Sequence, residues 1–172
     1  HVGTLDPLAS GLLGLLVGAA TRLSEYLIEK DKRYRAHVRF GRATTTYDAE
    51  GAVTLETDQA PGLPELEAAL SGFRGPLLQR PPAYSAVKRA GQRAYVLARR
   101  GEEVALEPRP VTIHALTLEA WNPPEAVLAV HCSSGTYIRS LAHDLGQALG
   151  CGAHLAGLRR TAVGLWTLEQ AC

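Results

Sequence analysis

The sequence predicts an α+β fold, in which a mixed and largely antiparallel sheet is flanked by helices. Two kinds of segment indicate this fold: short stretches that alternate apolar and polar residues, and stretches with apolar residues at helical spacing. These segments follow one another without the regular strand–helix–strand repeat of parallel sheets. The 172 residues, of which 46% are hydrophobic and 20% charged, suffice for one globular domain with a substantial core.

The first two segments are apolar and lie near the start of the chain. Residues 12–17 form a short run bounded by glycine, which predicts either a buried strand or the start of a helix. Residues 21–29 place Leu23, Tyr26 and Leu27 on one side of a helix. We therefore expect a helix with one apolar face over this second segment.

The next segments mix a strand, turns and a short helix. Residues 34–40 alternate apolar residues with basic ones, which predicts a half-buried strand, and residues 43–51 are turn-like. Residues 64–70 begin with a proline suited to a first helical position and continue with apolar residues, so they predict a short helix. Two prolines exclude a regular helix from residues 76–82.

The second half of the chain carries the strongest patterns. Residues 92–100 predict a helix that ends at Gly101. Residues 111–119 and 126–132 predict two strands joined across an asparagine and two prolines. Residues 136–149 have apolar residues at regular helical spacing and predict an amphipathic helix.

The distribution of charge along the chain says more about the binding partner than the net charge does. The net charge is only +1, but five cations and no acid lie between residues 88 and 100. A second basic cluster spans residues 30–35, and tyrosines stand within or beside both clusters. Such segments suit a phosphate backbone with stacked bases. Solvated helix faces are the alternative, and charge alone does not decide between them.

The sequence predicts neither a membrane-spanning segment nor a metal site. The longest apolar stretch, residues 12–20, is interrupted by Gly14 and Gly18 and is shorter than the roughly 20 residues of a membrane span. No signal peptide opens the chain, which predicts a cytoplasmic protein. The three cysteines form no CxxC pair, and Cys151 and His154 have CxxH spacing without a second ligand pair. We therefore expect no disulfide framework and no metal site.

Residues 3–11, GTLDPLASG, are the first that could carry chemistry. They place Asp6 among apolar and glycine residues. As a helix N-cap, Asp6 would be followed by Pro7 at the first helical position, and spacing alone favours this interpretation. The alternative is a carboxylate in a partly dry loop, where glycines let a ligand approach the backbone closely.

Five blocks of the chain are informative together: GTLDPLASG (3–11), KRYRA (32–36), PPAYSAVK (81–88), GTYIRSLA (135–142) and residues 150–160. The first four resemble, in this order, the central catalytic motif, the tyrosine motif, the proline-rich segment and the arginine motif of TruB-type pseudouridine synthases. The fifth block continues the match. A nine-residue loop alone would be a moderate signal, but five ordered blocks cover nearly the whole chain. The resemblance implies a pseudouridine synthase catalytic domain over residues 1–172.

The resemblance implies three catalytic residues. Asp6 would be the nucleophile, and Arg139 would be the fixed cation that keeps its carboxylate ionised in a desolvated pocket. Tyr34 would stack on the flipped uracil and help to move a proton. Periodicity alone places Arg139 off the apolar face of its helix and predicts an exposed arginine. It predicts that Tyr34 is a core tyrosine on a half-buried strand.

The resemblance also implies residues that bind the substrate. Leu158 would line the base pocket, which is compatible with its being a core leucine. His1 would contact the RNA loop from which the nucleotide is everted, and Arg22 would touch RNA or the network around the aspartate. Asp48 would order the pocket, although an aspartate in a turn needs no special role.

A further implication concerns residues 80–107. They correspond to a mobile arm that closes on the RNA, in which Lys88, Arg89 and Arg93 would contact phosphates. Their charge could offset the few kcal/mol that extruding a base costs.

Together these implications predict an isomerase without a cofactor or metal that flips uridine 55 of the tRNA T-loop and converts it to pseudouridine. We expect a monomer. The family carries an earlier N-terminal segment and a C-terminal RNA-binding domain, so the chain is expected to be a catalytic-core fragment that lacks both.

Two alternatives remain at this point. The guide-RNA-dependent branch of the superfamily typically has Lys-Val-Thr after Asp-Pro, whereas residues 8–10 are Leu-Ala-Ser and favour the stand-alone bacterial type. The other alternative is an RNA-binding or tRNA-folding module without catalysis. The presence of Asp6, Tyr34 and Arg139 together favours an enzyme.

Overall fold

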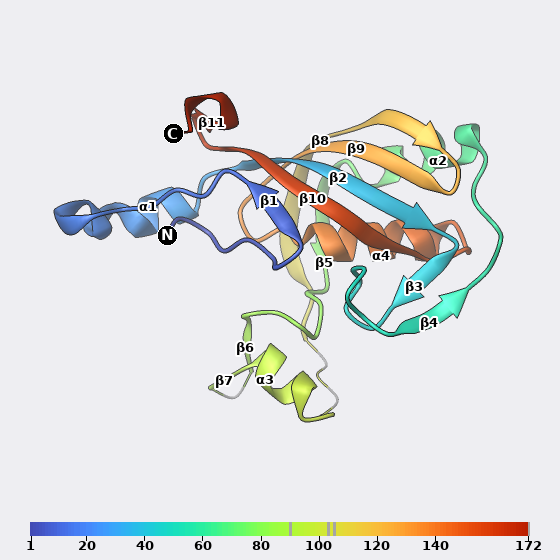
Figure 1. Cartoon of the computed structure of the whole chain (residues 1–172), viewed down its shortest axis with the longest axis horizontal. Helices are drawn as coiled ribbons and strands as arrows, with labels where there is room; N and C mark the ends of the chain where they lie inside the picture. The colour runs from blue at the N-terminus through green and yellow to red at the C-terminus, as the bar shows by residue number, and fades with distance from the viewer. Residues whose placement is uncertain (90, 103, 105, 172) are drawn as a thin grey trace.

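A seven-stranded sheet forms the centre of the computed structural model, which describes residues 1–89, 91–102, 104 and 106–171 (Figure 1). Among these residues, β1 pairs with β10 in parallel and all other strand pairs are antiparallel. The strands lie in the order β1 (Ala9–Gly11), β10 (Ala153–Val163), β2 (Lys32–Phe40), β9 (Glu125–Cys132), β8 (Arg109–Asn122) and β5 (Gly75–Gln79), and β11 (Trp166–Thr167) also pairs with β10. The expected α+β class with a largely antiparallel sheet is confirmed.

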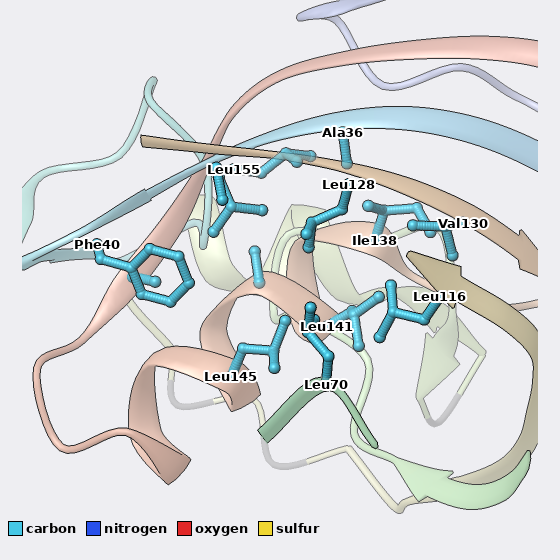
Figure 2. Close-up of a cluster of buried hydrophobic side chains, with 14 of the residues drawn as sticks. Ala36, Phe40, Leu70, Leu116, Leu128, Val130, Ile138, Leu141, Leu145 and Leu155 are labelled. Atoms are coloured by element: carbon cyan, nitrogen blue, oxygen red, sulfur yellow. The ribbon is translucent and has the colours of Figure 1, made fainter. Parts of the chain in front are cut away.

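The core lies between this sheet and the helix α4 (Ile138–Ala148), with α2 (Leu63–Gly72) packed beside it. Figure 2 shows leucines of α4 in one buried cluster with side chains of the strands above them. Leu145 is fully buried and Leu141 nearly so, which confirms the amphipathic helix predicted over 136–149. None of the helices in the described part of the chain has the length and apolar character needed to cross a membrane.

Several other elements form where local patterns predict them. Strand β2 buries alternate residues and exposes the basic ones between them. Helix α2 has its proline in the first turn, where a missing N–H is tolerated, and the Glu65 carboxylate accepts a hydrogen bond from Gly62 N at 2.9 Å. The strands predicted over 111–119 and 126–132 are present as β8 and β9, each slightly longer.

The two apolar segments near the N-terminus are the main correction. Residues 12–17, all of them described, form no buried strand and no helix. Gly14 makes a single bridge to Val2, and Leu15 and Val17 are 72% and 84% exposed. Strand β1 forms earlier instead, because Gly11, with φ of +103°, lets the chain lie directly against the backbone of Arg160.

The predicted helix over 21–29 is divided into a 3-10 turn, η1 (Gly18–Leu23), and a short helix, α1 (Ser24–Ile28). Its expected apolar face is largely open, since Leu23 is 51% and Tyr26 69% exposed. Figure 1 shows this segment projecting from the end of the sheet.

The remaining elements lie in two excursions from the sheet and at the C-terminal end. Beside the end of β2 lie β3 (Arg42–Thr44) and β4 (Val53–Glu56), and near the C-terminus lies η2 (Leu168–Gln170). A second excursion holds the hairpin of β6 (Lys88–Arg89) and β7 (Gln92–Arg93), followed by α3 (Ala94–Arg99). The helix predicted over 92–100 is therefore present but shorter, and Gly101 follows it at a positive φ of 76°.

Candidate active site

A cavity of about 650 Å³ opens where the loop of Asp6 meets the N-terminal end of α4. Its size is in the usual range for sites that hold small molecules or single bases. Asp6, Tyr34 and Arg139 all line it, and so does Leu158, which is 8% exposed. Four residues far apart in the sequence thus meet around one space.

Arg139 lies in the first turn of α4 and is only 5% exposed. Its Nε donates to Asp6 Oδ2 at 3.0 Å and its Nη2 to Asp6 Oδ1 at 2.8 Å, a two-pronged arrangement. Nη2 also donates to the carbonyl of Tyr84 at 3.1 Å, and Nη1 to that of Thr46 at 3.3 Å. The expectation of an exposed arginine is wrong, because loops from three other parts of the chain cover this side of the helix.

Asp6 lies in a turn, closed by a hydrogen bond from Ala9 N to Asp6 O at 2.9 Å, that leads into β1. The element that directly follows this turn is a strand and not a helix, so the N-cap interpretation is wrong. Its side chain is 28% exposed, whereas that of Arg139 is 6% exposed. The guanidinium therefore fixes both carboxylate oxygens from the buried side, while the carboxylate stays accessible from the cavity.

A second carboxylate, that of Asp48, supports the same guanidinium from behind. Its Oδ2 lies 3.5 Å from Arg139 Nη1, and its side chain is 4% exposed. Thr46 Oγ1 and the backbone N–H of Glu50 donate to its other oxygen. Because an arginine held from two sides loses little further freedom when it binds Asp6, Asp48 positions Arg139. Both carboxylates are engaged with one cation, an arrangement that orients Asp6 rather than one that gathers metal ligands.

Tyr34 reaches the cavity from β2, whose register with β10 places it opposite Arg160. Burial raises the pKa of the Tyr34 phenol to about 12, with the thiol of Cys132 adding to the shift and Arg160 opposing it. The phenol is therefore neutral at pH 7. A neutral phenol can stack on a base and can pass a proton on while it takes one up.

Two further cations near the site were missed from the sequence. Arg160 is 1% exposed and holds the loop of Asp6 in place, donating from Nε to Leu12 O at 2.8 Å and from Nη2 to Gly3 O at 3.1 Å. Lys32 lines the cavity. Its Nζ donates to Ser134 Oγ at 3.1 Å and to the backbone carbonyl of Ile28. Burial, followed by the charge of Arg160, lowers the pKa of Lys32. A cation on the inward side of an alternating strand was the signal that could have identified Arg160, because buried cations are rare.

The residues expected to bind RNA lie in different places. Arg93 of β7 lines the cavity. His1 and Arg22 are exposed and lie outside its lining, Arg22 within η1. Lys88 and Arg89 form β6, but their side chains are outside the part that the structure describes.

Family models and known sequences match this chain over nearly its whole length. Residues 1–138 match the TruB family pseudouridylate synthase (N terminal domain), and residues 139–172 match the tRNA pseudouridylate synthase B C-terminal domain. Proteins named tRNA pseudouridine synthase B are similar over 99% of the chain: 54% identical in Pseudomonas aeruginosa, 52% in Chromobacterium violaceum and 49% in Methylobacillus flagellatus. The chain spans 56–57% of the length of these relatives.

Solved structures agree with the sequence comparison. The crystal structure of a Cbf5-Nop10-Gar1 complex matches 97% of this chain and 40% of that chain, with a TM-score of 0.73 and 29% identity. A structure of an H/ACA RNP bound to a substrate RNA containing 2'-deoxyuridine matches 97% of this chain and 39% of that chain, with a TM-score of 0.69 and 25% identity. With its cavity, its motifs and both family domains in agreement, the chain belongs to the TruB family of pseudouridylate synthases.

Proposed function

We propose that the protein isomerises uridine to pseudouridine in tRNA, with Asp6 as the nucleophile. The observation that carries this proposal is the carboxylate of Asp6, fixed by the buried fork of Arg139 at an open cavity. The names of the curated relatives support tRNA as the substrate. Because the chain spans little more than half of their length, the activity is assigned to the whole protein.

The chemistry suits a carboxylate without a cofactor. The bond from ribose C1' to N1 breaks and a bond from C1' to C5 forms. The C5 proton leaves and N1 takes up a proton in exchange with solvent, so no oxidant or other reactant is needed. Asp6 acts either by adding to the uracil ring or by stabilising the cation-like ribose. In both routes Arg139 orients the carboxylate through its two hydrogen bonds, and the neutral phenol of Tyr34 relays a proton.

The cavity can receive the uridine only after its base has left the RNA stack. Extruding a base costs a few kcal/mol, least from a loop that is already partly unstacked. Tyr34 and Leu158, which both line the cavity, offer an aromatic and an aliphatic surface for the uracil. A loop uridine meets this requirement, and with the family resemblance we infer that the target is uridine 55 in the T-loop of tRNA. We also propose that the protein acts as a monomer.

Residues 80–107 are proposed as the arm that contacts RNA. Two backbone hydrogen bonds tie α3 to the preceding segment, from Ala94 N to Val87 O at 2.7 Å and from Tyr95 N to Ser85 O at 3.0 Å. The carbonyl of Tyr84, just before them, accepts from Arg139. The start of the arm thus contacts the same guanidinium that holds Asp6. Outside the cavity, His1 and Arg22 would extend the surface that holds the RNA.

A guide-RNA-dependent enzyme is the second candidate, because the matched solved structures include an H/ACA RNP. Their identity to this chain is 25–29%, against 49–54% for the curated tRNA pseudouridine synthase B proteins. Residues 8–10, Leu-Ala-Ser, also favour the stand-alone enzyme over the guided one. We therefore favour action on tRNA without a guide.

Tritium release from tRNA transcripts labelled at C5 of uridine tests the proposal in the full-length protein. Asp6→Asn should lower the rate by at least about 1,000-fold. Asp58→Asn, which makes the same change at an exposed position, should retain the parent rate. Binding of unlabelled tRNA should be similar in all three proteins.

Three outcomes would contradict the proposal. A parent-like rate in Asp6→Asn would remove Asp6 from the nucleophile role. Binding without release in the parent would favour a tRNA-folding module, and release that requires an added guide RNA would favour the guided enzyme.

A further inference from the structure

Away from the cavity, three side chains of metal-ligand type meet on the surface. Asp31 immediately precedes β2, His114 belongs to β8 and His131 to β9. The Oδ2 atom of Asp31 lies 3.3 Å from His114 Nε2 and 3.6 Å from His131 Nε2. One ligand atom from each residue lies within 4.8 Å of both others.

The backbone, and not chance side-chain placement, brings these three residues together. Ile113 pairs with Cys132 and Ala115 with His131, so His114 is the extra residue of a β-bulge. Bulges redirect side chains, and here the bulge brings His114 to His131, with ring centroids 4.9 Å apart. Asp31 is held by a hydrogen bond from Gly164 N to its carbonyl at 2.8 Å.

The spacing suits a tetrahedral metal ion. Ligand atoms bound at about 2.0–2.1 Å to one tetrahedral zinc ion lie about 3.3 Å apart. Both distances from Asp31 are close to that value, and the two imidazoles need to approach each other by at most about 1.5 Å. Two imidazoles and one carboxylate are the ligand set of zinc sites that keep a fourth position for water. Side chains that are 32–47% exposed leave room for that water.

We propose that Asp31, His114 and His131 form a binding site for a divalent transition metal ion of the zinc class. The site is separate from the cavity: Lys32, which follows Asp31, lines the cavity, and neighbouring side chains at the start of a strand point to opposite faces. The proposal does not depend on the proposed isomerase activity. A bound ion would join the starts of β2 and β8 to the end of β9 and so stabilise the folded chain.

The alternative is a purely ionic cluster, in which protonated histidines pair with Asp31. Burial, then the charge of Arg33, then His114 lower the pKa of His131. A metal ion binds imidazole only in its neutral form, so the ionic cluster and the metal site require different protonation states of the same two histidines. Arg33 also repels an incoming cation, and the carboxylate of Asp31 offsets that repulsion.

Calorimetric titration of the untagged, chelator-treated full-length protein with Zn²⁺ tests the site directly. One ion per chain should bind with micromolar affinity at pH 7.5, and Mg²⁺, which prefers oxygen ligands, should not compete. At a hundred-fold excess over Kd, Zn²⁺ should raise Tm by roughly 4 °C.

His114→Gln should weaken Zn²⁺ binding more than about 10-fold, since even outer partners of metal ligands are worth that much. Asp31→Asn should weaken it as well. The matched control is His37→Gln, an exposed histidine of β2, which should leave binding unchanged. Unliganded Tm values report whether each variant folds. Absence of saturable binding at one ion per chain, or parent-like affinity in His114→Gln, would overturn the proposal.

Discussion

Two segments of the chain carry apolar residues at helical spacing, yet only one of them is covered. Helix α4 lies against the sheet and buries Leu141 and Leu145, whereas η1 and α1 project from the end of the sheet with Leu23 and Tyr26 exposed (Figure 1). The local pattern is similar in both. The difference lies in what faces them: α4 meets β10 and β2, and none of the described residues covers Leu23 and Tyr26 to the same degree. Periodicity therefore specifies a face but not its partner.

Truncating one leucine on each helix tests this contrast most strongly. Leu145→Ala removes a fully buried side chain and leaves a cavity, so we expect a loss of about 3 kcal/mol in the free energy of unfolding. Leu23→Ala, at a 51% exposed position, should change it by less than about 0.5 kcal/mol. Urea unfolding of the two variants measures both values. Equal losses would show that η1 packs against more of the protein than the described contacts indicate.

Arg139 shows where local pattern stops being informative. Its position in α4 is off the apolar face, and the spacing of the helix correctly identifies that face. Its burial depends on the loops of Asp6, Thr46 and Tyr84, which come from three distant parts of the chain. Only the resemblance to known motifs anticipated its contact with Asp6, because no periodicity within one helix encodes contacts with loops 55–133 residues away.

Gly146 of α4 provides a second comparison, in which we expect a change of intermediate size in the free energy of unfolding. A Cβ at Gly146 would lie 2.1 Å from Ala153 N and 2.4 Å from Gly152 C, so Gly146→Ala must push the helix away from β10. We expect a loss of about 2 kcal/mol, opposite in sign to the gain of about 1 kcal/mol that alanine gives in an open helix. Thermal unfolding measures the change.

The control for this substitution is Gly72→Ala at the end of α2, where a Cβ meets nothing within 4 Å. That variant should be neutral or slightly stabilised. A stabilised Gly146→Ala would mean that α4 can move from the sheet without cost, contrary to its tight packing.

The strands illustrate the same division between local and long-range information. The alternation of β2 was evident from its sequence, because each residue reports its own face. The pairing of β2 with β10, which brings Tyr34 opposite Arg160, depends on register across more than a hundred residues. The Asp31, His114 and His131 cluster likewise has no sequence spacing to reveal it, since its members come from three strands or strand ends. Motif resemblance anticipated that Tyr34 meets Asp6 and Arg139, but nothing in the sequence anticipated its pairing with Arg160 or the second cluster.

The smallest expected effect concerns a carboxyl group on α4. Burial raises the pKa of Asp144 from 3.8 to about 6, so the folded chain holds this proton more tightly than the unfolded chain. Between about pH 4 and 6 the stability contributed by this group falls as the pH rises, and above pH 6 the ionised carboxylate carries its full cost. Asp144→Asn should therefore stabilise the protein at pH 7.5, by an amount on the order of 1 kcal/mol because the group keeps part of its hydration. It should have little effect at pH 4.

Urea unfolding at both pH values measures this difference, with Glu25→Gln on the exposed side of α1 as the matched control. The control removes the same charge without relieving a buried carboxylate, so its effect should stay within about 0.5 kcal/mol at each pH. If Asp144→Asn were neutral at pH 7.5, the carboxylate would have to be as well hydrated in the fold as in the unfolded chain. Helix α4 and helix α1 would then differ only in how far their apolar faces are buried.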